Sequence, residues 1–404
     1  MAQSKILVGL EIGTTKTCMV VGEIRPDSSA TIIGVGETPS AGVRKGEIND
    51  QSMARQCVCD AWQLAQDHAD ADILSIYLSV TGEHIVSENS EGSYRLDDTE
   101  NVIDEHHMDI AREKAEKKEL GSDRFVLHRE LGDFSIDGGD PTPHPVGLSG
   151  RTLDVKCHLV HGIRTRLQNS LLCVRQVPLE VEDLVFAPLA TAQMVLSRQQ
   201  KESGALLIDI GGGTTDFICY KGGDIVTSGC IPVGGNTINA DIVKLSEQRI
   251  TNKVAEVLKC TEGNAFGDVK DRSVARHMGE MGMHDVSLPR GVLNSIIRDR
   301  LADTLLMVRD RIPADLLKPG NLSIYFSGGT SLMRGLDDLA RYLFNMPVYQ
   351  PVLPETGTAS YLADPRYCTA IGLIRYAQRF DDDALRGKDP SMLQRFFNLF
   401  RRTH

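Results

Sequence analysis

The sequence predicts an α/β protein built from two related halves, with an α+β subdomain inserted into the first half. Three observations predict this fold class: a strand-and-glycine pattern that occurs twice, helical segments that alternate with short apolar strands, and one stretch, residues 83–163, where the alternation breaks down. The length of 404 residues fits two to three domains of about 150 residues each.

The repeated pattern consists of an apolar run, an acid, one apolar residue, glycine and hydroxyl residues. It occupies residues 7–16, with the acid at Glu11, and residues 206–216, with the acid at Asp209. Apolar residues resume after each glycine turn, so each strand is expected to return as a hairpin. The two acids are 209 − 11 = 198 residues apart. This spacing is too long for a solenoid repeat and fits two related halves.

Helical patterns separate the predicted strands, as expected for an α/β fold. They cover residues 52–69, 182–199, 238–245 and 293–311. In the inserted stretch, strands are predicted at 84–87, 124–130 and 152–160, with a charged helix at 108–120. A late strand at 322–326 leads into a glycine turn, and a further helix is expected from about residue 334.

The composition excludes several classes of protein. Apolar residues make up 41% and charged residues 25% of the chain, as in an ordinary soluble globular protein. The net charge of −11 argues against nucleic acid as a partner. The nine cysteines form no recurring CxxC pairs, so we expect no disulfide scaffold or zinc ribbon, and a reduced cytosolic setting. We find no apolar run long enough to span a membrane as a helix, and Glu11 interrupts the apolar start, unlike a secretory signal.

Both glycine turns have the residue types that bind nucleotide phosphates. Glycine lets several backbone N–H groups approach a phosphate closely. Threonine hydroxyls can add donors, and Lys16 can place a positive charge on a phosphate. Glu11 and Asp209 end their strands beside these turns and suit magnesium held through water. Either turn alone could be an ordinary loop, whereas the matched pair favours nucleotide binding. A third turn, at 327–331, can lie against a purine and ribose.

In this order, the three turns resemble the phosphate 1, phosphate 2 and adenosine motifs of the actin-like ATPase superfamily. Over nearly its full length the chain resembles the FtsA family of bacterial cell-division proteins. The resemblance is carried by residues 8–14, by the turn at 144–150 and by the closing segment 364–373. It implies an actin-like two-lobed fold with duplicated RNase H-like halves, in which the insert is the subdomain called 1C.

The resemblance also implies the domain boundaries. Subdomain 1A would comprise 1–82, 164–198 and 366–380; subdomain 1C, 83–163; subdomain 2A, 199–242 and 320–365; and subdomain 2B, 243–319. Residues 381–391 are polar and rich in charge, and we predict them to be a flexible linker. The segment 261–285 departs from the usual family sequence, which leaves the partner surface near it undetermined.

Carried over residue by residue, the family's ATP site falls on the following positions: Gly13, Thr14, Thr15, Lys16, Gly211, Gly212, Gly213, Thr214, Thr215, Gly234, Gly235, Asn236, Glu256, Lys259, Gly328 and Gly329. Magnesium would lie near Glu11 and Asp209. For Glu256 and Lys259 the alternative is a solvated ion pair one helical turn apart. No residue matches the glutamine that positions the attacking water in actin, since residues 186–189 are apolar. The chain is therefore expected to be at most a slow ATPase, with ATP as a conformational ligand.

The C-terminal residues 392–402 predict an amphipathic helix on an anionic membrane surface. At 100° per residue the apolar side chains cover one face and the polar and basic ones the other. The residues expected at the membrane are Met392, Leu393, Arg395, Phe396, Phe397, Leu399, Phe400, Arg401 and Arg402. The alternative is a terminal helix docked on the protein's own core, which the polar linker before it disfavours.

By resemblance, the chain would polymerise on the cytoplasmic face of the cell membrane at the division site and tether the FtsZ ring there. Subdomain 2B would take the C-terminal peptide of FtsZ, with Arg300 as a candidate contact. Subdomain 1C would contact later division proteins and neighbouring protomers. The alternatives are a scaffold like the pilus-assembly protein PilM, which lacks the terminal membrane helix, and a small-molecule kinase on the same fold, for which the insert shows no convergent polar motif.

Overall fold

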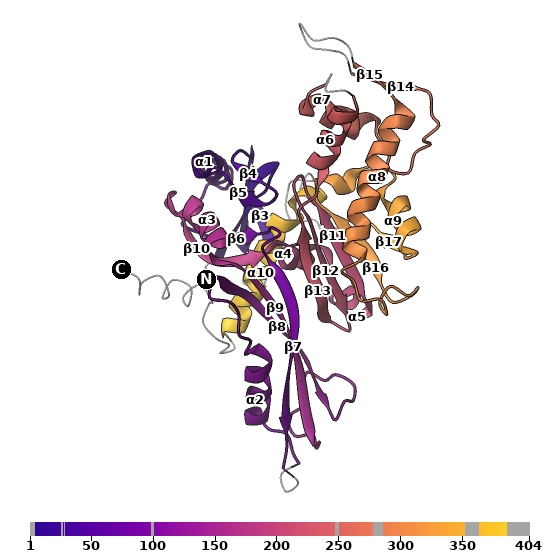
Figure 1. Cartoon of the computed structure of the whole chain (residues 1–404). Helices are drawn as coiled ribbons and strands as arrows, with labels where there is room; N and C mark the ends of the chain where they lie inside the picture. Colours follow the sequence, from indigo (N-terminus) through magenta and orange to yellow (C-terminus); the bar gives the residue numbers. More distant parts are fainter. Residues whose placement is uncertain are drawn as a thin grey trace.

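The computed structural model describes residues 5–385 apart from 26, 28, 98–100, 247–249, 278–285 and 352–362. These residues form two lobes, each built around a five-stranded sheet, and a subdomain that projects from the first lobe (Figure 1). The predicted amphipathic helix at 392–402 lies outside the described residues. Among the residues that are described, no helix is long and apolar enough to cross a membrane.

The sheets of the two lobes have the same topology. In lobe I the order is β10-β6-β1-β2-β3, and in lobe II it is β17-β16-β11-β12-β13 when read in the same direction. In each lobe the first three strands are joined antiparallel and the next two are added in parallel. This confirms the predicted duplication and the actin-like fold class. The strands are β1 (Lys5–Ile12), β2 (Lys16–Ile24), β3 (Ala30–Pro39), β6 (Ser75–Val80), β10 (Glu180–Phe186), β11 (Ala205–Ile210), β12 (Thr215–Lys221), β13 (Asp224–Ile231), β16 (Ser323–Ser327) and β17 (Val348–Tyr349).

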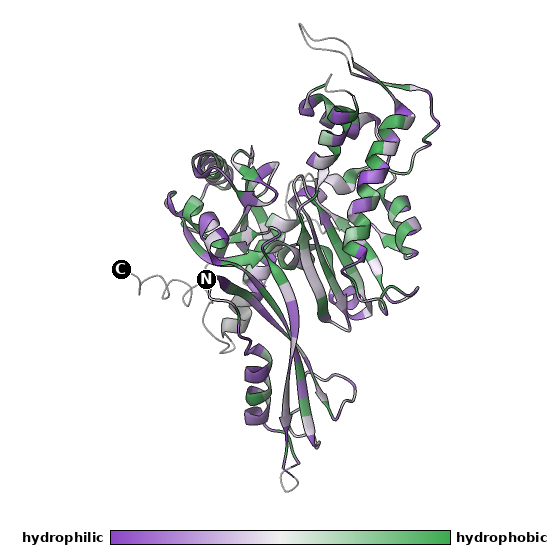
Figure 2. Ribbon diagram, in the orientation of Figure 1, coloured by the Kyte–Doolittle hydropathy of each residue, from purple (hydrophilic) through white to green (hydrophobic). Residues whose placement is uncertain are grey.

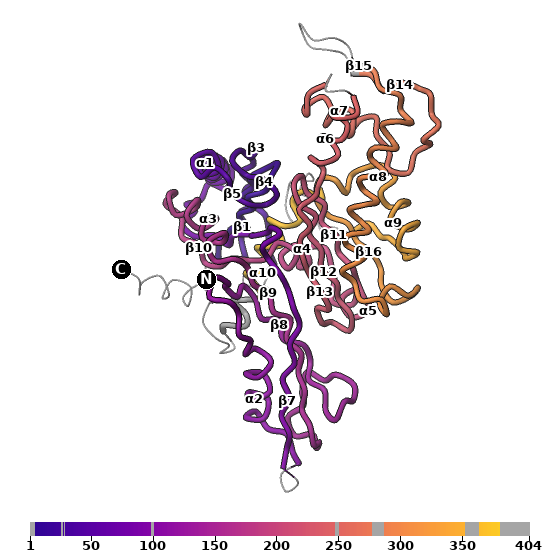
Figure 3. Tube along the Cα trace, viewed as in Figure 1, coloured from indigo at the N-terminus to yellow at the C-terminus, as the bar shows by residue number. Residues whose placement is uncertain are grey.

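Helices cover the sheets, and the strands between them are rich in hydrophobic residues (green in Figure 2). The lobe I helices are α1 (Gln51–Ala69), α3 (Arg164–Arg175), α4 (Ala187–Val195) and α10 (Cys368–Leu385). The lobe II helices are α5 (Arg198–Ser203), α6 (Gly235–Leu245), α7 (Asn252–Glu262), α8 (Arg290–Arg309) and α9 (Leu336–Phe344). The short hairpins are β4 (Val43–Arg44) with β5 (Glu47–Ile48), and β14 (Val274–His277) with β15 (Val286–Pro289). In Figure 3 the yellow α10 returns to the lobe in which the chain began.

The inserted subdomain consists of β7 (Val86–Arg95), α2 (Glu105–Glu116), β8 (Arg124–Ile136) and β9 (Thr152–Ile163), with strand order β7-β9-β8. It also contacts the edge of the lobe II sheet. The Ser87 hydroxyl donates to the Ser228 carbonyl of β13 at 2.6 Å, and the Asn89 amide donates to the Val226 carbonyl at 2.7 Å. A ring nitrogen of His158 lies 2.8 Å from the Ser228 hydroxyl. Side chains of β7 and β9 therefore satisfy backbone groups that an edge strand would leave exposed.

The strand predicted at 84–87 begins instead at Val86 and continues to Arg95, and two other predicted elements also differ in the structure. Residues 182–199 were expected to form one helix, but Glu180–Phe186 is strand β10, parallel to β6, and only Ala187–Val195 continues as α4. Alternation of buried and exposed residues over 180–183 favours a strand, and Pro188 is tolerated only in the first helical turn. At the other end, α10 continues to Leu385, so the first five residues predicted as linker are helical, and 386–391 lie outside the described residues.

Candidate functional site

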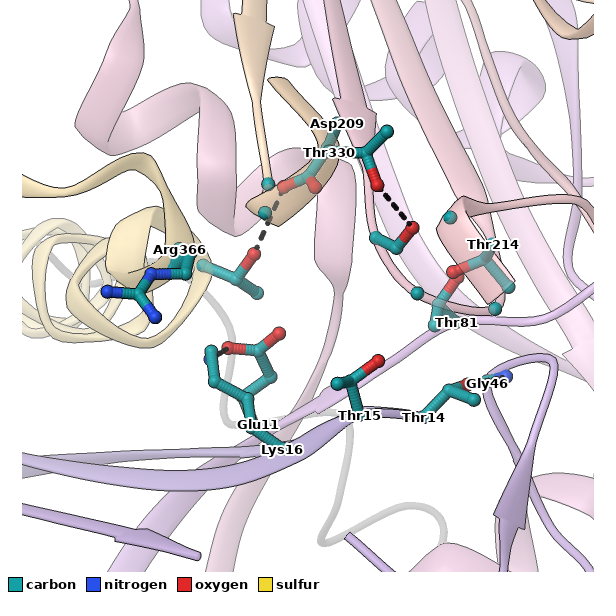
Figure 4. A pocket seen from close by; sticks show the side chains of 18 of the residues that line it. Glu11, Thr14, Thr15, Lys16, Gly46, Thr81, Asp209, Thr214, Thr330 and Arg366 are labelled. Carbon is teal, nitrogen blue, oxygen red and sulfur yellow. Dashed lines mark hydrogen bonds and ion pairs between the residues drawn. The ribbon is translucent and has the colours of Figure 1, made fainter. Parts of the chain in front are cut away.

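A cavity of about 810 Å³ lies between the two lobes and is lined by both of the predicted glycine turns, after β1 and after β11. Its volume is within the range of about 300–1,000 Å³ that is typical of small-molecule sites. Figure 4 shows Glu11, Thr14, Thr15 and Lys16 of lobe I facing Asp209 and Thr330 of lobe II across this space. The cavity therefore brings together two motifs that are far apart in the sequence.

The first turn connects β1 to β2. The Gly13 N–H donates to the Lys16 carbonyl at 2.9 Å and closes the hairpin. The Lys16 ammonium donates to a Glu11 carboxylate oxygen at 2.7 Å. Burial alone would lower the pKa of Lys16, but the Glu11 carboxylate beside it raises that pKa above its ordinary value. Lys16 is thus held as a cation inside the pocket.

The second turn, between β11 and β12, has the same hydrogen bond, from the Gly211 N–H to the Thr214 carbonyl at 2.9 Å. Its Gly211 and Gly212 carbonyls accept from the N–H groups of Gly235 and Asn236, which begin α6. The two turns meet across the cleft so closely that a Cβ atom added to Gly213 would lie 2.8 Å from the Thr14 Cβ. The turns therefore form two facing sides of one narrow space.

Buried carboxylates lie at the base of this space. One Asp209 oxygen accepts from the hydroxyls of Thr191 and Thr369, each at 3.3 Å. Burial, together with Asp216 and Glu11 nearby, raises the pKa of Asp209 to about 7. Burial likewise raises the pKa of Asp216 to about 6, although the hydrogen bonds from Thr81, Cys230 and Thr214 act to lower it. A divalent cation would compensate this crowding of negative charge, so the residues fit magnesium.

The magnesium expected near Glu11 and Asp209 would be held largely through water. In the ranges that the structure describes, no three histidine, cysteine or carboxylate side chains are grouped as direct ligands of a metal ion. Magnesium commonly retains several waters and binds one or two carboxylates together with phosphate oxygens. Both predicted carboxylates line the same cavity, as that arrangement requires.

The other end of the cavity holds the predicted adenosine residues. The Lys259 ammonium lies 2.6 Å from a Glu256 carboxylate oxygen and also donates to the Gly235 carbonyl at 3.3 Å. The Lys259 side chain is only 5% exposed, against 47% for Glu256. The pair is therefore not a solvated surface pair, because its lysine is buried at the cavity wall. Gly328, Gly329 and Thr330 complete this end, and the Thr330 hydroxyl donates to the Gly211 carbonyl.

Some predicted residues do not line the cavity. Thr215 is buried behind the second turn and its hydroxyl donates to the Val233 carbonyl at 2.8 Å. Gly234 packs against the backbone of Gly211 and Gly212 and is not among the residues that line the cavity. Arg300 forms a two-bond ion pair with Asp241 of α6, at 2.6 and 3.2 Å. Its role as a partner contact remains a prediction.

Several cavity residues were not predicted: Gly46, Thr81, Asp216, Arg366 and Thr369. The Thr81 and Thr214 hydroxyls both donate to Asp216, the former across the two lobes. A signal for Asp216 exists in the sequence, since it is a lone acid in the apolar return strand that follows the second turn. Of residues 186–189, where the sequence offers no glutamine to position a water, only Ala187 lines the cavity. Pro188 is buried next to it in the chain.

Comparison with known proteins places these features in a family. The family described as "Cell division protein FtsA" matches residues 206–372, and the one described as "SHS2 domain inserted in FTSA" matches residues 82–161. The chain is 33% identical to the cell division protein FtsA of Escherichia coli strain K12 over 386 residues, covering 93% of this chain and 90% of that protein. It is 32% identical to the FtsA of Neisseria meningitidis, covering 94% and 92%.

Solved structures with the same fold are more distant in sequence. A PilM–PilN type IV pilus biogenesis complex matches with a TM-score of 0.61 and 15% identity, covering 92% of this chain and 98% of that one. MreB5 of Spiroplasma citri bound to AMPPNP matches with a TM-score of 0.57 and 14% identity, covering 96% and 100%. These likenesses show the fold alone.

Proposed function

This chain belongs to the FtsA family of cell-division proteins, and on that premise we propose that it binds ATP with magnesium between its lobes and links the FtsZ ring to the membrane. The observation that carries the nucleotide part is the pair of matched turns that line one cavity, with Lys16 on one side and the Gly212 and Gly213 amides on the other. Fixed amides and a buried cation are what a polyphosphate needs.

Magnesium, when bound near Glu11 and Asp209, would neutralise phosphate charge. Lys16 would exchange part of its contact with Glu11 for a phosphate oxygen, since its ammonium has three donors. Glu256 and Lys259 would hold the ribose and base end. Hydrolysis is proposed to be slow because Ala187 and Pro188 offer no side chain that could orient a water. We expect turnover below about one ATP per second.

The membrane and partner roles follow from the family and from the sequence of the C-terminal segment. The amphipathic segment 392–402 would hold the chain on the cytoplasmic face of the membrane, where copies would polymerise. Residues 243–319, with Arg300 as a candidate contact, would bind the FtsZ C-terminal peptide. The inserted subdomain would recruit later division proteins. Repeated copies on one membrane would strengthen each weak attachment through effective concentration.

Replacing Lys16 by alanine tests the nucleotide site. We expect ATP affinity, measured by calorimetry with magnesium, to fall by about 10- to 100-fold, because a charge-assisted hydrogen bond to phosphate is lost. Lys117→Ala, on the exposed end of α2, removes the same charge elsewhere and should leave affinity unchanged. Equal affinities of the wild type and Lys16→Ala would contradict the proposed site.

Vesicle sedimentation tests the tether. The full chain, with magnesium ATP, should pellet with vesicles that contain anionic lipid and should carry purified FtsZ with them. A chain ending at Asp389 should lose most of this pelleting. Each apolar side chain of 392–402 that enters the membrane would contribute about 1 kcal/mol of binding free energy, and the truncation removes that contribution. Unchanged pelleting after truncation would exclude the membrane helix, and vesicles that bind the chain but no FtsZ would exclude the tether.

A further inference from the structure

We propose that a second pocket, at the junction of the inserted subdomain with lobe II, binds a small organic anion, namely a phosphate or carboxylate group on a compact apolar body. This junction pocket has a volume of about 420 Å³, within the range of about 300–1,000 Å³ that is typical of small-molecule sites. It shares no lining residue with the cavity between the glycine turns, so the proposal does not depend on the proposed nucleotide site.

The junction pocket lies where three parts of the chain meet. The inserted subdomain contributes residues of β7, β8 and β9, and lobe II contributes the β12–β13 hairpin and residues 313–316 after α8. Lys201 of α5 and Arg379 of α10 complete the lining. Figure 1 shows β7, β8 and β9 running past β13 at this junction. A ligand in the pocket would therefore tie the insert to lobe II and to the last helix of lobe I.

The insert side of the pocket is held by contacts with lobe II. Strand β8 has a bulge here, and Gly132 within it packs against Asp224 of the β12–β13 hairpin. A Cβ atom added to Gly132 would lie 2.7 Å from an Asp224 carboxylate oxygen. The ring nitrogens of the buried His158 lie 2.6 Å from the Asn89 side-chain oxygen and 2.8 Å from the Ser228 hydroxyl. These contacts give the pocket a defined wall in the absence of a ligand.

Positive charge is in excess in the junction pocket. Four lining residues are basic and three are acidic: Lys156, Lys201, Lys221 and Arg379, against Glu130, Asp224 and Asp315. Within the part of the chain that the structure describes, none of these four cations forms an ion pair with a carboxylate. In the proposed nucleotide cavity, by contrast, Lys16, Lys259 and Arg366 are each paired with one. An anion that enters the junction pocket would therefore meet cations that are not yet neutralised.

Lys201 is the cation whose surroundings most favour a bound anion. It is half-buried, with its ammonium 5.1 Å from the centre of the buried Tyr220 ring, and it donates to the Gln193 side-chain oxygen at 3.3 Å. Burial, and then the positive charge of Arg379, lower the pKa of Lys201 to about 8, although Glu130 acts to raise it. An anion placed against both cations would offset the cost of burial and the repulsion between them.

Lys221 adds a third cation in a fixed position. Its ammonium donates to the Ser203 carbonyl at 2.9 Å and to the Asn321 carbonyl at 3.0 Å. An ammonium has three N–H donors, so one remains for a ligand. Because both acceptors are neutral, the positive charge of Lys221 also remains to be balanced by an anion.

The apolar lining residues set the class of ligand. The Leu131 side chain on β8 is 38% exposed, and it lines the pocket together with Ile225, Val226, Pro313 and Leu316. An inorganic ion would leave these side chains in contact with water. A ligand with an apolar body beside its anionic group would cover them and gain the corresponding hydrophobic free energy. The pocket therefore favours an organic anion over a free inorganic one.

Calorimetric titration of the full chain with four probes tests the site. The organic anions are phenyl phosphate and phenylacetate; inorganic phosphate lacks the apolar body, and benzyl alcohol lacks the charge. At least one organic anion should bind about tenfold or more tightly than both inorganic phosphate and benzyl alcohol, because each of these lacks one half of what the pocket recognises. The tighter of the two organic anions identifies the anionic group.

Two variants remove different parts of the site. K201Q/R379Q should weaken the tighter organic anion by about tenfold or more, because two charge-assisted contacts are lost. Leu131→Asp places a negative charge at an exposed position of the wall and should weaken it by a similar factor, which covers the case in which K201Q/R379Q does not fold. The matched control R95Q/K117Q removes the same charge from exposed positions of the insert and should keep the wild-type affinity. Lys16→Ala should also keep it.

Hydrogen exchange of the wild type locates the site without any substitution. The organic anion should slow exchange in β8 and in the β12–β13 hairpin, which line the pocket, and leave the glycine turns at 11–16 and 209–215 unchanged. The proposal is overturned if neither organic anion binds more tightly than inorganic phosphate, or if both variants keep the wild-type affinity. Slower exchange at the glycine turns alone would place the probe in the other cavity and would equally overturn the junction site.

Discussion

Replacing Gly213 by alanine is expected to weaken ATP binding by about 100-fold while leaving the thermal unfolding temperature within a few degrees of the wild type. The added Cβ atom would lie 2.3 Å from the Thr14 Oγ1 and 2.8 Å from the Thr14 Cβ. Rotation of Thr14 moves its hydroxyl but cannot move its Cβ, so the two turns must separate. Phosphate groups held from both sides lose their donors when the sides move apart by about 1 Å.

The same substitution should spare stability because Gly213, although buried, belongs to a turn that lines the cavity and is not part of the hydrophobic clusters of the two lobes. Calorimetric titration with magnesium ATP and scanning calorimetry measure the two effects separately. A Thr14→Gly change added to Gly213→Ala removes the clashing Cβ and should restore part of the affinity. If the double variant binds ATP no better than Gly213→Ala alone, steric separation of the turns is not the cause.

The two glycine turns that line the cavity could be predicted because each is a local pattern. An acid, a glycine and hydroxyl residues follow one buried strand directly, so their relation is set within about ten residues of chain. The repeat of that pattern also predicted the duplicated topology, which the identical strand orders of the two sheets confirm. Glu256 and Lys259 required the family resemblance, since their spacing alone fits an ordinary surface pair.

The rest of the site depends on contacts that no local pattern specifies. Thr81 and Asp216 are 135 residues apart and meet only because the lobes close on each other. Gly46 reaches Thr14 from a hairpin whose two strands have only two residues each. Strands of that length are too short to show an alternating hydrophobic pattern in the sequence. The strand β10 was mistaken for part of a helix because it runs directly into α4 without an intervening loop. The hydrophobic pattern therefore changes from the period of a strand to the period of a helix at Phe186, with no turn residues to mark the change.

The second large effect concerns a buried acid outside the proposed nucleotide site. Asp183 of β10 accepts from the Leu184 N–H at 2.9 Å and from the Tyr376 hydroxyl of α10 at 3.3 Å. Burial raises the pKa of Asp183 to about 7, outweighing the two donated hydrogen bonds. The neighbouring His128 of β8 is also buried, and its pKa is lowered to about 3, so it stays neutral while Asp183 titrates.

Asp183→Asn should therefore change how stability depends on pH. Between the ordinary pKa of 3.8 and the folded value of about 7, the folded chain keeps a proton that the unfolded chain has released. Stability then falls as pH rises through this window, by up to about 1.4 kcal/mol per pH unit. Asparagine resembles the protonated acid and does not titrate, so the variant lacks this decline. Relative to the wild type, it should gain up to about 4 kcal/mol between pH 4 and pH 7.5.

Urea unfolding of both proteins at pH 4.5, 6 and 7.5 measures this gain. Titration of His128 and the other histidines in the unfolded chain contributes equally to both proteins and cancels in the difference. Asp315→Asn, at an exposed position between α8 and β16, serves as the control for the same change of residue type outside the buried site. Parallel curves for the wild type and Asp183→Asn would mean that the pKa of Asp183 is not raised in the folded chain, because the hydrogen bonds from Tyr376 and Leu184 offset at least the whole effect of burial.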